Sequence, residues 1–376
     1  MVLKPFIRFP LAVLLLGLHH WSYGQQARQQ VLTNFENLTI DSMQNRVYYE
    51  QRLYRNPMIG LLELSQALTS PEQTEFVPLV QGVPIAGFQI GSSVRTRLLN
   101  QEERKQLAKQ LPFGQKRYKF DFRIQPEVIA NFGFKLDPFQ TKTSLLLQSQ
   151  LYLTRGLALN FGIVFPLTNN YDNQAMNIRS GPFFLNQFLA FNRQHFLLAS
   201  AGLFYLNQYG LHVQYRWANL TKPWSAGLES GLTGYYYFPR TGIYYESMKN
   251  LTLVGDVAYR INARDVTLKL SAGQFLYGDQ GGRFDLIRQF TSVEVGVYVS
   301  KTTRGSTAGF NFTIPIPPGR IVQGKRVRLR SSEEFRWEYT YNGSGANVAY
   351  RPKSGNQLDV LLRQYHSGYL TNQLRE

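Results

Sequence analysis

The chain has 376 residues, a formal net charge of +17, no cysteine, and 23 Tyr and 26 Phe. The absence of cysteine excludes a disulfide-braced secreted domain and a lipid-anchoring cysteine behind a leader. The excess of positive charge predicts acidic partners, for which outer-membrane lipids and anionic polysaccharide are expected and nucleic acid is not.

Residues 1–24 are predicted to be a cleaved signal peptide. Lys4 and Arg8 form a basic start, residues 11–18 are apolar, and small residues follow at 22–24. The apolar run is too short to span a bilayer as a helix. Export without disulfides favours the envelope of a Gram-negative bacterium, and the outer membrane is the expected location.

Residues 25–114 are predicted to form a small periplasmic α+β element. A strand is expected in residues 45–57, followed by an amphipathic helix that places Leu61, Leu64 and Leu68 near one face. Two short strands are expected within 74–90. The polar stretch 97–111 is interpreted as a solvent-exposed helix or linker.

Residues 115–342 are dominated by segments of alternating polarity. In residues 292–300, Val293, Val295, Val297 and Val299 alternate with polar residues that include Glu294. We find roughly twelve to fourteen such segments of about ten residues, which is typical of a transmembrane antiparallel up-and-down β-barrel. A soluble β-sandwich also alternates, but its strands are shorter and its exposed faces polar. Residues 343–376 are treated as a C-terminal tail.

On the barrel interpretation, the valines face lipid and the charged residues face the lumen. Their mixed signs favour cross-strand pairs that brace a filled or narrow interior over a wide selective pore. The predicted inward residues are Lys119, Asp121, Arg123, Arg216, Glu229, Asp256, Arg260, Lys269, Glu294, Glu334, Arg336 and Glu338. The candidates for lumen lining and glycan contact among them are Lys119, Arg123, Arg216, Glu229, Asp256, Arg260, Lys269, Glu294 and Arg336.

A dense basic cluster follows at Lys325, Arg326, Arg328 and Arg330. The simpler interpretation is a solvated loop or strand end, and the alternative is contact with lipid phosphates or an acidic glycan. No metal site, cofactor or catalytic residue is predicted, because His195, His212 and His366 lack ligand spacing. A lipid-modifying enzyme that pairs His212 with a nearby serine stays open as an alternative.

Several blocks resemble the YjbH-type exopolysaccharide biosynthesis proteins. The strongest are "GLFYLNQYG" at 202–210 and "GQFLYGDQGGRFDLIRQF" at 273–290, and the resemblance spans most of 45–341. It implies an outer-membrane β-barrel linked to production or export of extracellular polysaccharide. Familiar long members are nearly twice this length, so a single barrel is expected here.

The family offers no catalytic residues to carry over, so the expected role is non-enzymatic assistance to polysaccharide export. Other polysaccharide-export proteins are expected partners. The alternatives are a general porin, a barrel enzyme that modifies outer-membrane lipid, and a soluble periplasmic β-sandwich binding protein.

Overall fold

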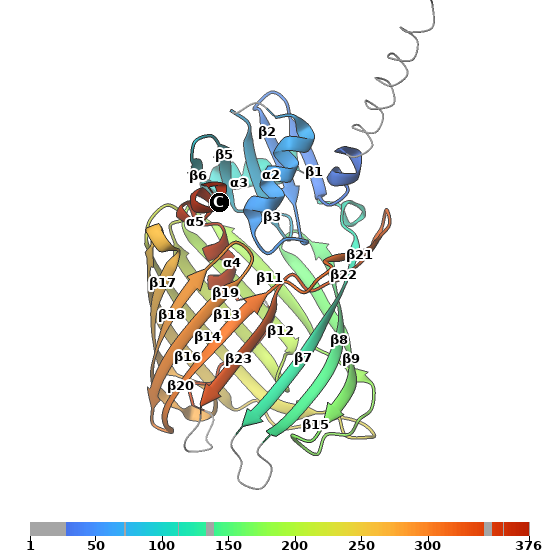
Figure 1. Ribbon diagram of the computed structural model, residues 1–376, viewed down its shortest axis with the longest axis vertical. Coiled ribbons are helices and arrows are strands. Elements are labelled where there is room, and N and C mark those ends of the chain that lie inside the picture. The colour runs from blue at the N-terminus through green and yellow to red at the C-terminus, as the bar shows by residue number, and fades with distance from the viewer. Residues whose placement is uncertain are drawn as a thin grey trace, which may run out of the picture.

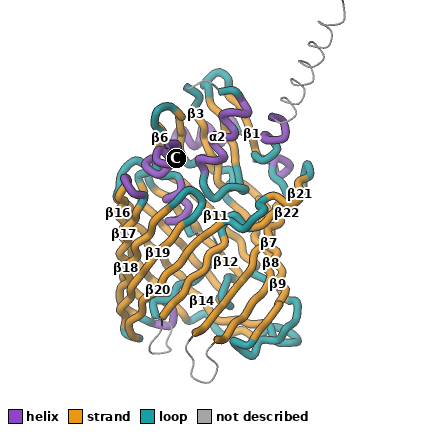
Figure 2. Tube along the Cα trace, viewed as in Figure 1, coloured by secondary structure: helices purple, strands orange, loops and turns teal. Residues whose placement is uncertain are grey.

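The computed structural model describes residues 28–70, 73–111, 113–132, 139–341, 348–355 and 357–375, so the predicted signal peptide lies outside the described residues. The chain is mostly β-sheet. A small N-terminal domain lies at one end of a large curled sheet, and the C-terminal helices lie between them (Figure 1). Figure 2 shows that the helices gather at the N-terminal domain's end of the molecule.

The N-terminal domain is built on a mixed sheet in the order β1-β2-β3-β5-β6, with β4 paired to β3. β2 and β3 are parallel, and the other pairs are antiparallel. The strands are β1 Glu36–Asp41, β2 Arg46–Glu50, β3 Glu75–Val80, β4 Val83–Pro84, β5 Ala86–Ile90 and β6 Val94–Leu98.

One helix covers each face of this sheet. α2 (Pro57–Leu68) begins at Asn56, whose side chain accepts from the Met58 N–H, and it buries Leu61 and Leu64 as predicted. α3 (Gln101–Gln110) has a capping box between Asn100 and Glu103.

The polar stretch 97–111 is thus partly a helix, but it is not wholly solvent-exposed as expected. Leu107 of α3 is buried with Tyr48 and Val77, whose chain neighbours Val47 and Phe76 pack with α2 on the opposite face. The domain therefore has three layers.

The large sheet is an antiparallel meander of long strands, each paired with its neighbours along the chain. Its strands are β7 Phe120–Phe132, β8 Phe139–Thr154, β9 Leu157–Asn169, β11 Phe183–Phe191, β12 His195–Leu203, β13 Gln208–Ala218, β14 Trp224–Tyr237, β16 Asn250–Ile261, β17 Val266–Gln274, β18 Gln280–Gln289, β19 Glu294–Thr302, β20 Gly305–Ile314 and β23 Phe335–Tyr341, with short β10 Arg179–Ser180, β15 Tyr244–Tyr245, β21 Arg320–Gln323 and β22 Val327–Ser331.

The sheet curls so far that its last strands come round to its first. β23 pairs with β20 and lies next to β7 in the strand order. The backbone ladder on that side of β7, however, is a parallel one with β22 over Phe120 to Ile124. The predicted all-β, up-and-down architecture is confirmed at the level of a curled antiparallel sheet.

The two faces of this sheet have opposite character. Along β19, Glu294 is 1% exposed and Tyr298 is 3% exposed, whereas Val297 and Val299 are 50% and 55% exposed. Among the described residues, none of the helices combines the length and the apolar character that a membrane crossing requires. Outward apolar residues that are at least 38% exposed include Leu211, Val213, Leu228, Leu232, Leu251, Leu253, Val257, Leu270, Phe284, Leu286, Val295 and Phe310.

The described part of the C-terminal tail, residues 348–355 and 357–375, runs through the inside of the curled sheet. At the end far from the N-terminal domain, the Leu276 N–H donates to the Tyr350 carbonyl, and Tyr205 pairs with Lys353. At the near end, the Tyr369 hydroxyl donates to the carbonyls of Phe290 and Thr291. The tail therefore spans the interior from end to end, finishing in α4 (Leu358–Gln364) and α5 (Ser367–Arg375).

Candidate functional site

Glu294 is the meeting point of three parts of the chain. Its carboxylate lies 3.1 Å from Arg55 Nη2 of the N-terminal domain, 3.1 Å from Arg363 Nη2 of α4 and 3.4 Å from Arg336 Nη2 of β23. One buried carboxylate thus holds the domain, the tail and the sheet together. The inward placement of Glu294 and Arg336 was predicted by parity, but the two arginines from outside the sheet were not.

A second ionic cluster fixes α4 to β16 and β17. Lys269 Nζ lies 2.8 Å from Asp359 of α4 and 3.9 Å from Asp256 of β16, and Asp256 also pairs with Arg216. Burial would disfavour the charged form of Asp359, but Lys269 and Arg363 outweigh it and hold the pKa of Asp359 well below its usual range. The predicted inward positions of Arg216, Asp256 and Lys269 agree with these contacts.

His212 connects a tail serine to a wall glutamate. Its Nδ1 lies 2.6 Å from Ser354 Oγ, and its Nε2 lies 2.9 Å from Glu229 Oε1. The other oxygen of this carboxylate, Oε2, lies 3.2 Å from Nη1 of the tail residue Arg351. The order resembles a nucleophile, base and acid, but Ser354 is 2% exposed and the adjoining cavity is about 40 Å³. Such a space accommodates water rather than an acyl chain, so the geometry favours a brace between tail and wall.

Arg260 lies inward, at the end of the sheet next to the N-terminal domain. Its Nη2 lies 2.5 Å from Asp265, its Nη1 donates to Gln289 at 2.5 Å, and its guanidinium faces the Tyr369 ring of α5 at 5.6 Å. Arg260 therefore supports the docking of α5.

Two of the predicted sets need correction. Lys119 was expected in the lumen, but it precedes β7 and its Nζ donates to the Thr33 carbonyl at 2.6 Å, at the junction with the N-terminal domain. In the basic cluster, Lys325 and Arg326 are exposed as expected, but Arg328 and Arg330 are 0% and 3% exposed.

The reason is that β22 lies beside β7 and turns these two arginines inward. Arg328 Nε lies 2.6 Å from Asp121 Oδ1, and Arg330 Nη2 lies 2.7 Å from Asp121 Oδ2. The sequence "VRLRS" could have predicted that the two arginines point the same way, because residues 328 and 330 share one face of a strand.

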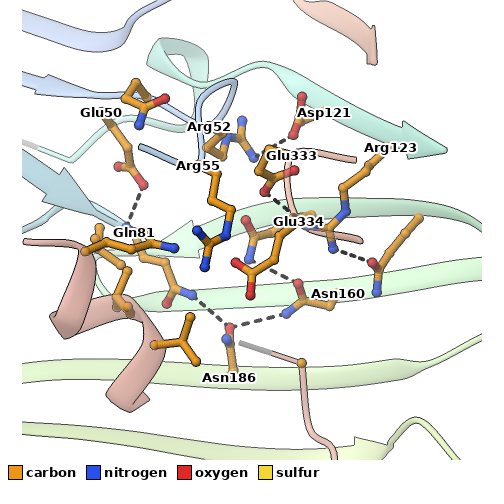
Figure 3. A pocket seen from close by; sticks show the side chains of 18 of the residues that line it. Glu50, Arg52, Arg55, Gln81, Asp121, Arg123, Asn160, Asn186, Glu333 and Glu334 are labelled. Atoms are coloured by element: carbon orange, nitrogen blue, oxygen red, sulfur yellow. Dashed lines mark hydrogen bonds and ion pairs between the residues drawn. The ribbon is translucent and has the colours of Figure 1, made fainter. Parts of the chain in front are cut away.

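The main cavity lies where the N-terminal domain meets the curled sheet and α4. Its volume is about 130 Å³, and its lining comes from all three parts. Figure 3 shows Glu50, Arg52, Arg55 and Gln81 of the domain facing strand residues such as Asn160 and Asn186. Of the predicted inward residues, Asp121, Arg123 and Glu334 belong to this lining, whereas Arg52, Arg55 and Gln81 were missed.

The domain's contribution to the cavity includes an unusual carboxyl group. Glu50 is 2% exposed and accepts from the Gln81 N–H at 2.6 Å, the Gly82 N–H at 2.9 Å and the Tyr152 hydroxyl at 2.7 Å. Burial raises the pKa of Glu50 to about 7, because its three donors only partly offset the loss of solvation.

The described residues hold no group of three or more His, Cys, Asp or Glu side chains arranged to bind a metal ion. The interior is a polar space lined by hydrogen-bond donors and acceptors and by side chains of both charges. That inventory suits a hydroxyl-rich ligand better than an apolar one.

Comparison with known proteins gives one match. Residues 181–317 match the family model described as "Exopolysaccharide biosynthesis protein YbjH". No curated protein and no solved structure matches the chain. The matched stretch runs from β11 to β20 and includes Glu294, His212 and both of the blocks that carried the resemblance. The resemblance to the YjbH exopolysaccharide biosynthesis family is thereby confirmed over residues 181–317.

Proposed function

We propose that this chain is an outer-membrane β-barrel protein of a Gram-negative bacterium that assists exopolysaccharide production or export without catalysing a reaction. The observation that carries the proposal is that the large sheet exposes its apolar side chains and buries its polar ones, together with the family match over residues 181–317. We call this arrangement inverted polarity. The family match suggests the process, and the inverted polarity supports the location.

The outward face supports a lipid environment. Val295, Val297 and Val299 are 40%, 50% and 55% exposed on one strand, and neighbouring strands carry Phe284, Leu286 and Phe310 at 38–42%. Water would disfavour a contiguous apolar surface of this extent, whereas hydrocarbon would not. Exposed Tyr244 and Tyr245 lie at the far end of the sheet, where an interfacial aromatic girdle is expected.

The inward face supports an accessory role over that of a general pore. The described tail residues, 348–355 and 357–375, occupy the interior along its length, held at Glu294, Lys269, His212 and the Tyr205–Lys353 bridge. An open diffusion channel needs a continuous aqueous path. A filled interior is better suited to holding one ligand or partner at the periplasmic mouth, where anionic polysaccharide and other export proteins are the proposed partners.

The test combines location with process. We expect the chain in the outer-membrane fraction, with gel migration that changes on heating, and we expect its deletion to lower secreted polysaccharide until the wild-type chain is restored. A detergent-free soluble protein with unchanged migration would refute the location. Unaltered secretion in the deletion strain would refute the process, and liposomes made permeable to small sugars would favour the porin instead.

A further inference from the structure

The main cavity has unused hydrogen-bonding capacity, and that capacity is mostly cationic. Arg55 is 4% exposed and uses Nη2 for Glu294, while its Nε and Nη1 have no hydrogen-bond partner in the part of the chain that the structure describes. Arg52 pairs with Glu36 through Nε and Nη2. Its Nη1 lies 4.0 Å from Asp121 Oδ2 but has no hydrogen-bond partner among the described residues. Unmatched N–H groups of a buried guanidinium are costly, so a ligand that accepts from them would be strongly favoured.

The acidic side chains in the same lining are already satisfied. Asp121 is held by Arg328 and Arg330, and Glu333 lies 3.2 Å from Arg123 Nη1. Glu334 lies 3.3 Å from Arg336 Nη2. Glu50 has its three donors. The unpaired guanidinium N–H groups of Arg55 and Arg52 therefore favour a negatively charged ligand.

Neutral groups complete the lining. Ser149 Oγ and Gln81 Oε1 are buried and find no hydrogen-bond partner within the described ranges. Tyr54, Tyr205 and Tyr365 contribute rings. A hydroxyl can serve as donor and acceptor at once, which matches an amide oxygen and a serine in one small space. In Figure 3 the Arg55 guanidinium points into the middle of these side chains.

We propose that this cavity binds one acidic sugar residue, a uronate, with Arg55 and Arg52 facing its carboxylate and Ser149 and Gln81 facing its hydroxyls. A cavity of about 130 Å³ limits the ligand to about one ring. The inference rests on the proposed function and narrows it from polysaccharide in general to a polymer that carries carboxylates. α4 and the N-terminal domain both line the site, so the bound sugar would also stabilise their contact.

The test is calorimetric titration of the full-length protein in detergent with sodium D-glucuronate, D-glucose and sodium acetate. Glucuronate should bind at least about tenfold more tightly than glucose, which lacks the carboxylate, and than acetate, which lacks the ring. Arg55→Met should abolish the preference for glucuronate over glucose.

A matched pair of serine variants keeps the inference falsifiable if Arg55→Met fails to fold. Ser149 and Ser300 are both buried, and both hydroxyls lack a hydrogen-bond partner among the residues that the structure describes. Ser149 lines the cavity and Ser300 does not. Ser149→Ala should weaken glucuronate binding about three- to tenfold, and Ser300→Ala should leave it unchanged. Equal binding of the three probes, no binding, or equal effects of the two serine variants would overturn the inference.

These outcomes are separable from the proposed function. A protein that resides in the outer membrane and is needed for secretion, yet does not bind glucuronate, refutes the uronate site alone. A protein that binds glucuronate but whose deletion leaves secretion intact refutes the role in export and leaves the site in place.

Discussion

In both the N-terminal domain and the large sheet, side chains alternate between the two faces of each strand, but the kind of side chain that is buried differs. In the domain, Phe76 and Phe88 are at most 1% exposed and form a core between sheet and helices. In the long sheet, Val297 is 50% exposed while Glu294 is 1% exposed. Alternation alone therefore identifies a strand with two different faces, and the surroundings decide which face is buried. The four predictions below test that contrast, beginning with the largest expected effect.

The inside of the long sheet should depend on paired charge. Glu294→Gln leaves Arg55, Arg336 and Arg363 without their shared carboxylate, and loss of one partner in a buried ionic group costs about 3–5 kcal/mol. We expect a lower midpoint of thermal unfolding in detergent and faster trypsin cleavage of the tail. Glu102→Gln, which removes an exposed pair with Lys105, is the control and should change neither.

The outsides of the two regions should respond differently to charge. Val297 of β19 and Ile40 of β1 are 50% and 54% exposed, which makes them a matched pair. Val297→Arg should cost about 2–4 kcal/mol if it faces lipid, and should lower the amount of protein in the outer membrane. Ile40→Arg should be neutral, because it faces water. Equal tolerance of both changes would show that the contrast does not reflect a membrane.

The junction between the N-terminal domain and the large sheet should show a pH dependence through Glu50, which accepts from Tyr152 of β8. The folded pKa of about 7 lies above the ordinary value of 4.5, so the folded state binds the proton more tightly. The stability from the neutral carboxyl is full below pH 4.5 and is lost as pH rises to about 7, a change on the order of 3 kcal/mol. Glu50→Gln should flatten this slope of unfolding free energy against pH. Identical slopes in both proteins would contradict the assignment.

The sequence predicted the regular parts of this molecule well. The strand pattern of 115–342, the inward placement of Glu294 and Arg216, and the helix with Leu61 and Leu64 all follow from local periodicity. Lys119 was placed wrongly because the alternation of inward and outward side chains was extended to the residue before β7, which begins at Phe120. Parity holds only inside the paired segment.

The rest depended on contacts between distant segments. Arg55 and Arg363 meet Glu294 across 239 and 69 residues of sequence, and no local pattern encodes that meeting. Residues 343–376 were treated only as a C-terminal tail. The helix α4 is seven residues long and carries charged residues, so its burial could not be predicted from the sequence. The main cavity was missed for the same reason, since three separate segments line it.

The smallest expected effect tests whether the two regions unfold separately. Asn100 caps α3 by accepting from the Glu103 N–H at 2.8 Å, and Glu103 accepts from the Asn100 N–H at 2.7 Å. Asn100→Ala should cost about 1 kcal/mol, and hydrogen exchange should quicken in α3 and β3 while β19 is unchanged. Lys105→Ala, on the exposed side of the same helix, is the control. If β19 exchanged faster as well, the Arg55–Glu294 and Arg104–Asn192 contacts would couple the domain to the sheet. The two regions would then unfold as one cooperative unit despite their opposite burial patterns.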